Sequence, residues 1–277
     1  MSPPSVVEQA NVDALLDAAE DALSTGDMVQ VFELCDRIDA LSPGHVDGHF
    51  LVAEAHRVLG DYKRAEVLYR SVIEEDPDYA DAWAGLAAMR FQALDFDEAG
   101  AAATRSIRSD PEGGQGWWWR GLVREQRGDF MGADRDFRRA SILMPVAFPW
   151  AVPLTDAMVE SMVQMAVETM HPLIQSTLPQ LNFFLEEVPS RQTLIDFDPV
   201  PAPHELLGFF SGVPLSERRP SDALPALPAA ITLYRRNLQR VAADGEGLLE
   251  ELRITVLHEL GHYLGLSEED LRTRGLD

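Results

Sequence analysis

Apolar and small residues in the first half of the chain recur at an interval of 34 residues. The interval is marked by residue pairs that suit a tight turn followed by a helix, at Gly26-Asp27, Gly60-Asp61, Leu94-Asp95 and Gly128-Asp129. Proline returns at the same interval, at Pro43, Pro77, Pro111 and Pro145. Because proline does not continue a helix, each of these residues lies at a boundary between units. The pattern predicts four stacked helix–turn–helix units, over residues 12–45, 46–79, 80–113 and 114–147.

The residues that share a position in these units resemble the tetratricopeptide-repeat pattern. One position is small, one is tryptophan and one is aromatic, as in Ala65, Ala99 and Ala133, Trp83 and Trp117, and Tyr69 and Phe137. The first unit departs from the pattern at Leu15, Val31 and Cys35, as expected of a terminal capping unit. The resemblance implies an all-α solenoid over residues 12–147 whose groove binds a protein or peptide partner.

Two features of this half invite a functional interpretation. Trp117 occupies the in-register core position, so Trp118 and Trp119 are expected to point elsewhere around their helix. The histidines at 45, 49 and 56 lie in the helical-repeat region without a supporting carboxylate arrangement, which favours a structural role over a second metal site.

The second half changes pattern after a proline-rich stretch, Pro145 to Pro153, which we interpret as the domain boundary. Met158, Met162 and Met165 follow at helical spacing and are expected to pack in a core. Further on, the pattern predicts a helix over Pro172–Val188, a strand over Thr193–Asp198, a loop over Asp222–Pro228, a strand over Ala230–Tyr234 and a helix over Gly247–Leu264. Helices mixed with short strands predict a small α/β domain over residues 155–277.

The last of these helices contains His258-Glu259-Leu260-Gly261-His262. Two histidines four residues apart lie on one helix face, so both imidazoles can reach the same metal ion. Glu259 lies beside them, where it can take a proton from water as a general base. This spacing is the HExxH signature of zinc hydrolases, and it predicts Zn²⁺ as the cofactor.

A third ligand must come from nearby. Gly265 can turn the chain out of the helix, which would bring back a ligand six residues after His262, and Glu268 occupies that position. Glutamate is one methylene longer than aspartate, so the alternatives Glu269, Asp270, His204 and His171 stay open.

Three segments of this half resemble the bacterial zincin-like metallopeptidases: Leu206–Leu215, Ile231–Arg236 and Val256–Ser267. The resemblance implies a zincin-like domain in which His258 and His262 bind the metal and Glu259 is the catalytic base. That family usually has Asp where this chain has Glu268.

A strand ahead of the metal helix can serve as an edge that pairs with an extended peptide substrate. Tyr234 and Arg235 end that strand. They either project toward the cleft or, as we favour, Tyr234 is a core residue and Arg235 a solvated edge charge.

The composition excludes several functions. A net charge of −23, shared by both halves, argues against nucleic-acid binding and is explained by solubility. The single cysteine, Cys35, excludes an intrachain disulfide. No signal-peptide pattern and no long apolar run are found, so we expect a soluble cytoplasmic protein without membrane contact.

The sequence as a whole predicts a zinc metallopeptidase that cleaves a peptide substrate, joined to a repeat domain that recruits a protein or peptide. The alternative is a non-catalytic interaction scaffold whose zincin-like domain binds metal structurally or has lost turnover.

Overall fold

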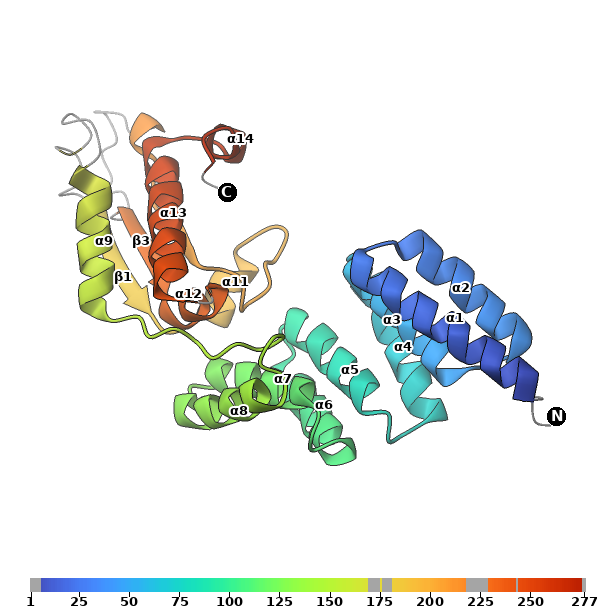
Figure 1. The fold of residues 1–277 in the computed structure, drawn as a ribbon. Helices are drawn as coiled ribbons and strands as arrows, with labels where there is room; N and C mark the ends of the chain where they lie inside the picture. The colour runs from blue at the N-terminus through green and yellow to red at the C-terminus, as the bar shows by residue number, and fades with distance from the viewer. Residues whose placement is uncertain (1–5, 169–174, 176–180, 218–228, 243, 276–277) are drawn as a thin grey trace. The chain divides into compact units, whose positions relative to one another are not determined.

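The computed structural model describes residues 6–168, 175, 181–217, 229–242 and 244–275. The chain divides into two compact units, Met1–Phe148 and Pro149–Asp277 (Figure 1). The described part of the first unit is all helical, and that of the second combines helices with a small sheet. The predicted fold class, an all-α repeat array followed by a small α/β domain, is confirmed.

The first unit consists of helices that pack against their neighbours in chain order. Their bounds are α1 Val6–Thr25, α2 Met28–Leu41, α3 Val46–Val58, α4 Tyr62–Glu75, α5 Ala80–Gln92, α6 Phe96–Ser109, α7 Gly114–Gln126 and α8 Phe130–Leu143. Helices α3, α5 and α7 begin at the starts of the predicted repeats, as the interval of 34 residues requires.

The turns within the four helix pairs are all closed in the same way. The aspartate of each Gly-Asp or Leu-Asp pair caps the second helix, because its carboxylate accepts a hydrogen bond from the backbone N–H three residues later. The residue before it has positive φ, which glycine adopts without steric cost. Leu94, at φ 59°, fills this position in the third pair and is the one non-glycine residue with positive φ in the described chain.

Aromatic side chains fill the spaces between these helices. Tyr69 is fully buried, and a Cβ atom on Gly85 would lie 2.4 Å from its ring, so only glycine lets α5 approach that closely. Gly121 of α7 faces Phe137 in the same way. Small residues on one helix therefore accommodate large residues on a neighbouring helix.

The tryptophan run of α7 differs from the prediction. Trp117 is not the core residue: it is half-buried, its indole N–H donates to the Pro111 carbonyl at 3.1 Å, and the Arg120 guanidinium stacks on its ring. Trp118 and Trp119 instead pack into the aromatic core of this unit. The helix turns about 100° per residue, so these two side chains point away from Trp117: Trp119 lies against Phe91 of α5, and Trp118 lies against Phe137 of α8.

The second unit is built on a three-stranded sheet of order β1-β3-β2 (Figure 1). Strand β3 (Ala229–Tyr234) lies at the centre, parallel to β1 (Leu181–Glu186) and antiparallel to β2 (Gly208–Ser211). Every residue of β3 is buried. Helices α9 (Asp156–Glu168) and α13 (Gly245–Leu264) pack with the sheet in one hydrophobic core. The shorter helices are α11 (Arg191–Ile195), η2 (Leu215–Glu217), α12 (Arg235–Val241) and α14 (Glu268–Arg272).

Two predicted elements of this unit are wrong. The helix expected over Pro172–Val188 is replaced at its C-terminal part by β1, where Leu181, Phe183 and Leu185 alternate with more exposed residues. Parallel pairing with β3, a non-local contact, overrides the local helical preference. Of the rest of that prediction, Gln175 is helical and residues 187–188 form a bend. Residues 172–174 and 176–180, and the loop over Asp222–Pro228, lie outside the described residues.

The strand expected over Thr193–Asp198 is instead helix α11. Ser190 caps it by accepting a hydrogen bond from the Thr193 N–H at 3.1 Å, and Leu194 is fully buried beneath the single turn. The expected methionine core is also only partly correct, since Met162 is buried but Met165 is 47% exposed.

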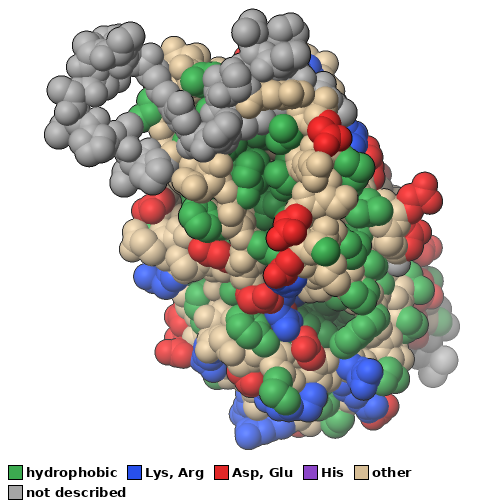
Figure 2. All heavy atoms as spheres, turned by 90° about the vertical axis from the view of Figure 1, so that its left-hand side faces the viewer, with side chains coloured by type: hydrophobic (Ala, Val, Ile, Leu, Met, Phe, Trp, Pro, Cys, Tyr) green, Lys and Arg blue, Asp and Glu red, His purple; other side chains and the backbone are tan. Residues whose placement is uncertain are grey.

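Charged and hydrophobic side chains are mixed over the face of the molecule drawn in Figure 2. Among the helices described, none has the length and apolar character needed to cross a lipid bilayer.

Candidate metal centre

Helix α13 positions the two histidines of the HExxH motif. Asp244 begins the helix by accepting a hydrogen bond from the Gly247 N–H at 2.8 Å. The core face of the helix is formed by Leu248, Leu252, Val256, Leu260 and Tyr263, all fully buried. The remaining face carries His258 and His262, whose Nε2 atoms lie 3.0 Å apart. The helix therefore presents two imidazole donors to one point beside the core.

The turn after α13 brings the third donor back. Gly265 adopts φ 92°, and the N–H of Leu266 donates to the Gly261 carbonyl at 3.0 Å, which closes the helix end. Ser267 then begins α14 in a capping box with Asp270. This reversal places the Glu268 carboxylate 3.2 Å from His262 Nε2 and 3.8 Å from His258 Nε2.

These three side chains form a donor set that fits a zinc ion. One ligand atom from each of His258, His262 and Glu268 lies within 4.8 Å of the others. Two Zn–N bonds of 2.0–2.1 Å at a tetrahedral angle require a nitrogen separation of about 3.3 Å, close to the 3.0 Å between the two Nε2 atoms. Two imidazoles and one carboxylate are donors that zinc accepts readily.

A hydrogen bond at Nδ1, the ring nitrogen that does not face the metal position, fixes the orientation of His262. Its Nδ1 lies 3.2 Å from the carbonyl oxygen of Leu266, to which it donates a hydrogen bond in the tautomer that leaves Nε2 free. The same turn that returns Glu268 thus also orients one of the histidines.

Glu259 lies in a different environment from its neighbours. Its side chain is 6% exposed, and burial raises the pKa of its carboxyl to about 8. The backbone N–H of Phe210 in β2 donates a hydrogen bond to the carboxylate, which opposes this shift, and the charge of Glu268 adds to it. A carboxyl group of this kind can hold or release a proton near neutral pH.

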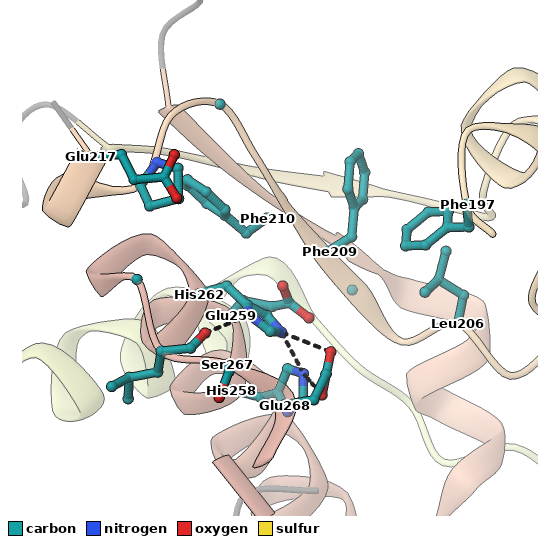
Figure 3. A pocket seen from close by; sticks show the side chains of 15 residues that line it. Phe197, Leu206, Phe209, Phe210, Glu217, His258, Glu259, His262, Ser267 and Glu268 are labelled. Carbon is teal, nitrogen blue, oxygen red and sulfur yellow. Dashed lines mark hydrogen bonds and ion pairs between the residues drawn. The ribbon is translucent and has the colours of Figure 1, made fainter. Parts of the chain in front are cut away.

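The three candidate metal donors and Glu259 all face one open cavity of ≈ 660 Å³ (Figure 3). His258, Glu259 and His262 come from α13, Glu268 from α14, and Phe209 and Phe210 from β2 on the opposite wall. Phe197, Leu206, Pro214 and Glu217 complete its ends. The cavity is large enough for several substrate atoms beside a metal ion.

The other predicted ligands lie elsewhere. Asp270 is held by Ser267 in the capping box, and Glu269 pairs with Arg272 at 2.7 Å. His204 does not belong to the donor cluster among the described residues; burial, together with the positive charge of Arg240, lowers its pKa to about 4. His171 lies outside the described residues.

The residues that end β3 lie away from the cleft. Tyr234 is fully buried, as the favoured interpretation held. Arg235 is not a solvated charge: it forms ion pairs with Glu187 and Asp156 and donates to the Leu154 carbonyl at 2.8 Å. The strand beside the metal site is β2 rather than β3, which is central. In the sequence, only the family resemblance over Leu206–Leu215 indicated that the β2 segment belongs to the site.

The three histidines at the start of α3 and within it behave as structural residues. His49 lies 3.4 Å from Glu75, His45 lies 3.8 Å from Asp47, and His56 packs on the Phe32 ring. Within the described chain they form no cluster able to hold a metal ion.

Comparison with known proteins supports this division of the chain. Residues 178–276 match the model of the zincin-like metallopeptidase family, and residues 59–117 match a tetratricopeptide-repeat model. No curated protein shows significant sequence similarity to this chain.

Three solved structures illustrate what this chain is similar to. A crystal structure of MamA has 19% identity and a TM-score of 0.41, covering 50% of this chain and 82% of that one. A thermophilic TPR protein of Thermus thermophilus has 16% identity and a TM-score of 0.43, covering 56% and 79%. PilF of Pseudomonas aeruginosa has 17% identity and a TM-score of 0.45, covering 57% and 68%. The C-terminal part of the chain, residues 178–276, is a zincin-like metallopeptidase domain, and tetratricopeptide repeats precede it.

Proposed function

We propose that the C-terminal unit is a zinc-dependent peptidase that hydrolyses peptide bonds. The observation that carries the proposal is the convergence of three donors, His258, His262 and Glu268, beside the buried carboxyl of Glu259 in an open cavity. Three protein ligands that leave a further position open are typical of catalytic zinc, whereas structural zinc has four. The match to the zincin-like metallopeptidase family supports the same assignment.

In this proposal Glu259 moves the protons. A bound zinc ion would supply Lewis-acid chemistry, by lowering the pKa of water and polarising the scissile carbonyl. The Glu259 carboxylate takes a proton from the attacking water and later gives it to the leaving amine, so the base is regenerated. Its burial supports this role, because loss of hydration raises the pKa of the carboxyl and so makes it a stronger base than an exposed glutamate.

Strand β2 would hold the substrate backbone. The Tyr234 N–H donates to the Leu207 carbonyl at 2.8 Å, and in an antiparallel pair such bonding residues alternate with residues that face outward. The N–H and C=O groups of Gly208 and Phe210 therefore lie on the side of β2 away from β3. An extended peptide can pair with that edge through Gly208 and the Phe210 carbonyl, while the Phe210 N–H donates to the Glu259 carboxylate.

The repeat array would recruit a partner. Tetratricopeptide repeats commonly present a groove to a protein or peptide, and the family match over residues 59–117 supports this role here. We assign to the first unit the recruitment of a protein partner or of the substrate itself.

The test compares wild type with Glu259→Gln, which keeps the size of the side chain while removing the base. Purified wild type should bind about one equivalent of zinc and cleave members of a peptide library. The variant should retain the zinc, with activity lower by a factor on the order of 10² or more. Equal activity in the two proteins would show that Glu259 is not the base, and a wild type that binds zinc yet cleaves nothing would rule out the peptidase assignment.

A further inference from the structure

A second hollow adjoins the catalytic cavity, along α13 on the N-terminal side of the metal donors. Its volume is ≈ 190 Å³. One wall is the approach to β2, with Glu205, Leu206 and Leu207, and the other is α13, with Glu251 and Ile254. We call it the Glu251 pocket. Because it shares Leu206, Gly208, His258 and Glu259 with the catalytic cavity, a group bound there lies next to the reacting atoms.

The position of Glu251 follows from the helix. It precedes His258 by seven residues, or two helical turns, so both side chains lie on the same face of α13. Glu251 is half-buried, and among the described residues its carboxylate forms no ion pair or hydrogen bond. The adjacent Glu250 differs, since it pairs with Arg253 at 2.6 Å. The charge of Glu251 is thus left uncompensated inside a pocket.

The remaining lining explains what such a pocket can hold. Leu206, Leu207 and Ile254 offer apolar walls, and Glu205 adds a second carboxylate. None of the lining residues is Lys or Arg. Lysine and arginine combine an apolar methylene stem with a cationic head, which matches apolar walls and two carboxylates. An acidic side chain would meet charges of its own sign.

We infer that the Glu251 pocket receives a lysine or arginine side chain of the substrate, next to the scissile bond. This inference rests on the proposed peptidase function and names its substrate class. Glu251 acts as a specificity residue and takes no part in the proton transfers assigned to Glu259.

The direction of β2 fixes the side of the scissile bond on which the basic residue lies. The strand begins at Gly208, beside the Glu251 pocket, and the chain then reaches Gly212 and Pro214 at the other end of the catalytic cavity. A substrate strand that pairs antiparallel to β2, the more stable arrangement, runs toward the Glu251 pocket. The basic residue therefore follows the cleaved bond, and the new N-terminus is Lys or Arg.

The experiment uses one peptide sequence with Lys, Arg, Gln or Glu at a single position, and identifies the cleaved bond by mass spectrometry. Wild type should cleave before Lys or Arg with kcat/KM higher than for Glu by a factor on the order of 10². Glu251→Lys should reverse this preference, so that the Glu peptide is cleaved with a higher kcat/KM than the Lys peptide. Glu246→Lys, an exposed position on the same helix outside the pocket, is the matched control and should keep the wild-type preference.

A binding measurement separates this inference from the peptidase proposal. In the zinc-loaded Glu259→Gln protein, the Lys peptide should bind more tightly than the Glu peptide, and Glu251→Lys in that background should reverse the order. Charge-dependent binding without cleavage by wild type would overturn the peptidase proposal and support the pocket. Cleavage with no preference for Lys, a basic residue found before the cleaved bond, or a preference unchanged in Glu251→Lys would overturn the inference.

Discussion

At the residue scale, Glu259 and Glu268 show how position gives two glutamates different chemistry. Glu259 is buried against β2, and loss of hydration raises the pKa of its carboxyl to about 8. Glu268 is 69% exposed and lies 3.2 Å from His262. A buried carboxyl suits proton transfer, whereas an accessible one can take up a metal ion directly. The motif spacing predicted both assignments, but the environments that distinguish them depend on β2, which the motif does not contain.

The assignment of Glu268 as a ligand can be tested against its neighbour. Glu268→Ala should weaken zinc binding by a factor on the order of 10 to 10², because one of three donors is lost. Glu269→Ala removes the same charge from a residue that pairs with Arg272, so zinc affinity should stay within about twofold. Competition titration with a chromophoric chelator measures both. Equal affinities in the two variants would place the third ligand elsewhere.

His204 should make the second unit sensitive to acid. Burial lowers its pKa from 6.5 to about 4, so the folded state binds a proton less readily than the unfolded chain. As the pH falls from 6.5 to about 4, the free energy of unfolding should decrease by on the order of 3 kcal/mol from this residue. His204→Gln should flatten that part of the profile in urea titrations of the full chain. A slope that persists unchanged in the variant would assign the acid sensitivity to other groups.

At the element scale, the turn between α13 and α14 joins the helix end to the metal donors. Its geometry was predictable, because Gly265 and Ser267 are standard signals for ending one helix and beginning another. The helices of the first unit were predictable for the same reason. The capping aspartates and the residues that recur every 34 positions are signals carried by short segments of the chain. The predictions for the segments that form β1 and α11 were wrong. The conformation of β1 depends on its pairing with β3, and that of α11 on the burial of Leu194, and no local sequence pattern encodes either.

Gly265→Ala should disturb this turn more than positive φ alone explains. A Cβ atom there would lie 1.9 Å from Ser216 Oγ and 2.8 Å from Ser216 Cβ, so η2 must move. We expect a loss of stability beyond the 1–2 kcal/mol that positive φ costs, roughly, together with weaker zinc binding, because the turn carries Glu268 and the Leu266 carbonyl. Gly275→Ala is the matched control, with φ 67° and nothing within 4 Å of the new Cβ. It should lose stability only, and zinc affinity that falls equally in both variants would contradict the role given to this turn.

At the scale of the whole molecule, the two units are stabilised by different contacts. The first is an array of helices in which neighbours bury each other's side chains, so its stability is a sum of nearest-neighbour interactions. The second has one core around β3, and all three candidate metal donors belong to it. The negative charge is common to both and gives no further distinction.

Residues 1–148 should therefore fold alone as a helical domain that is indifferent to metal. Far-ultraviolet circular dichroism of this fragment should show the helical signal, and a chelator should leave it unchanged. In the full chain, any change on chelation should be confined to residues 149–277, which hydrogen exchange can localise. A fragment whose helical signal collapses when metal is removed would contradict the division of the chain into these two units.

The closeness of the metal donors in sequence has a thermodynamic consequence. His258, His262 and Glu268 lie on one helix end and the turn that follows it. Bringing such near positions together costs little loop-closure entropy, so an unfolded chain can still gather the same donors around an ion. An ion that binds both states stabilises the folded one only by the difference between its two affinities. Loss of the metal should therefore lower the free energy of unfolding of this unit only a little. The apoprotein should stay folded and should bind zinc again when zinc is available.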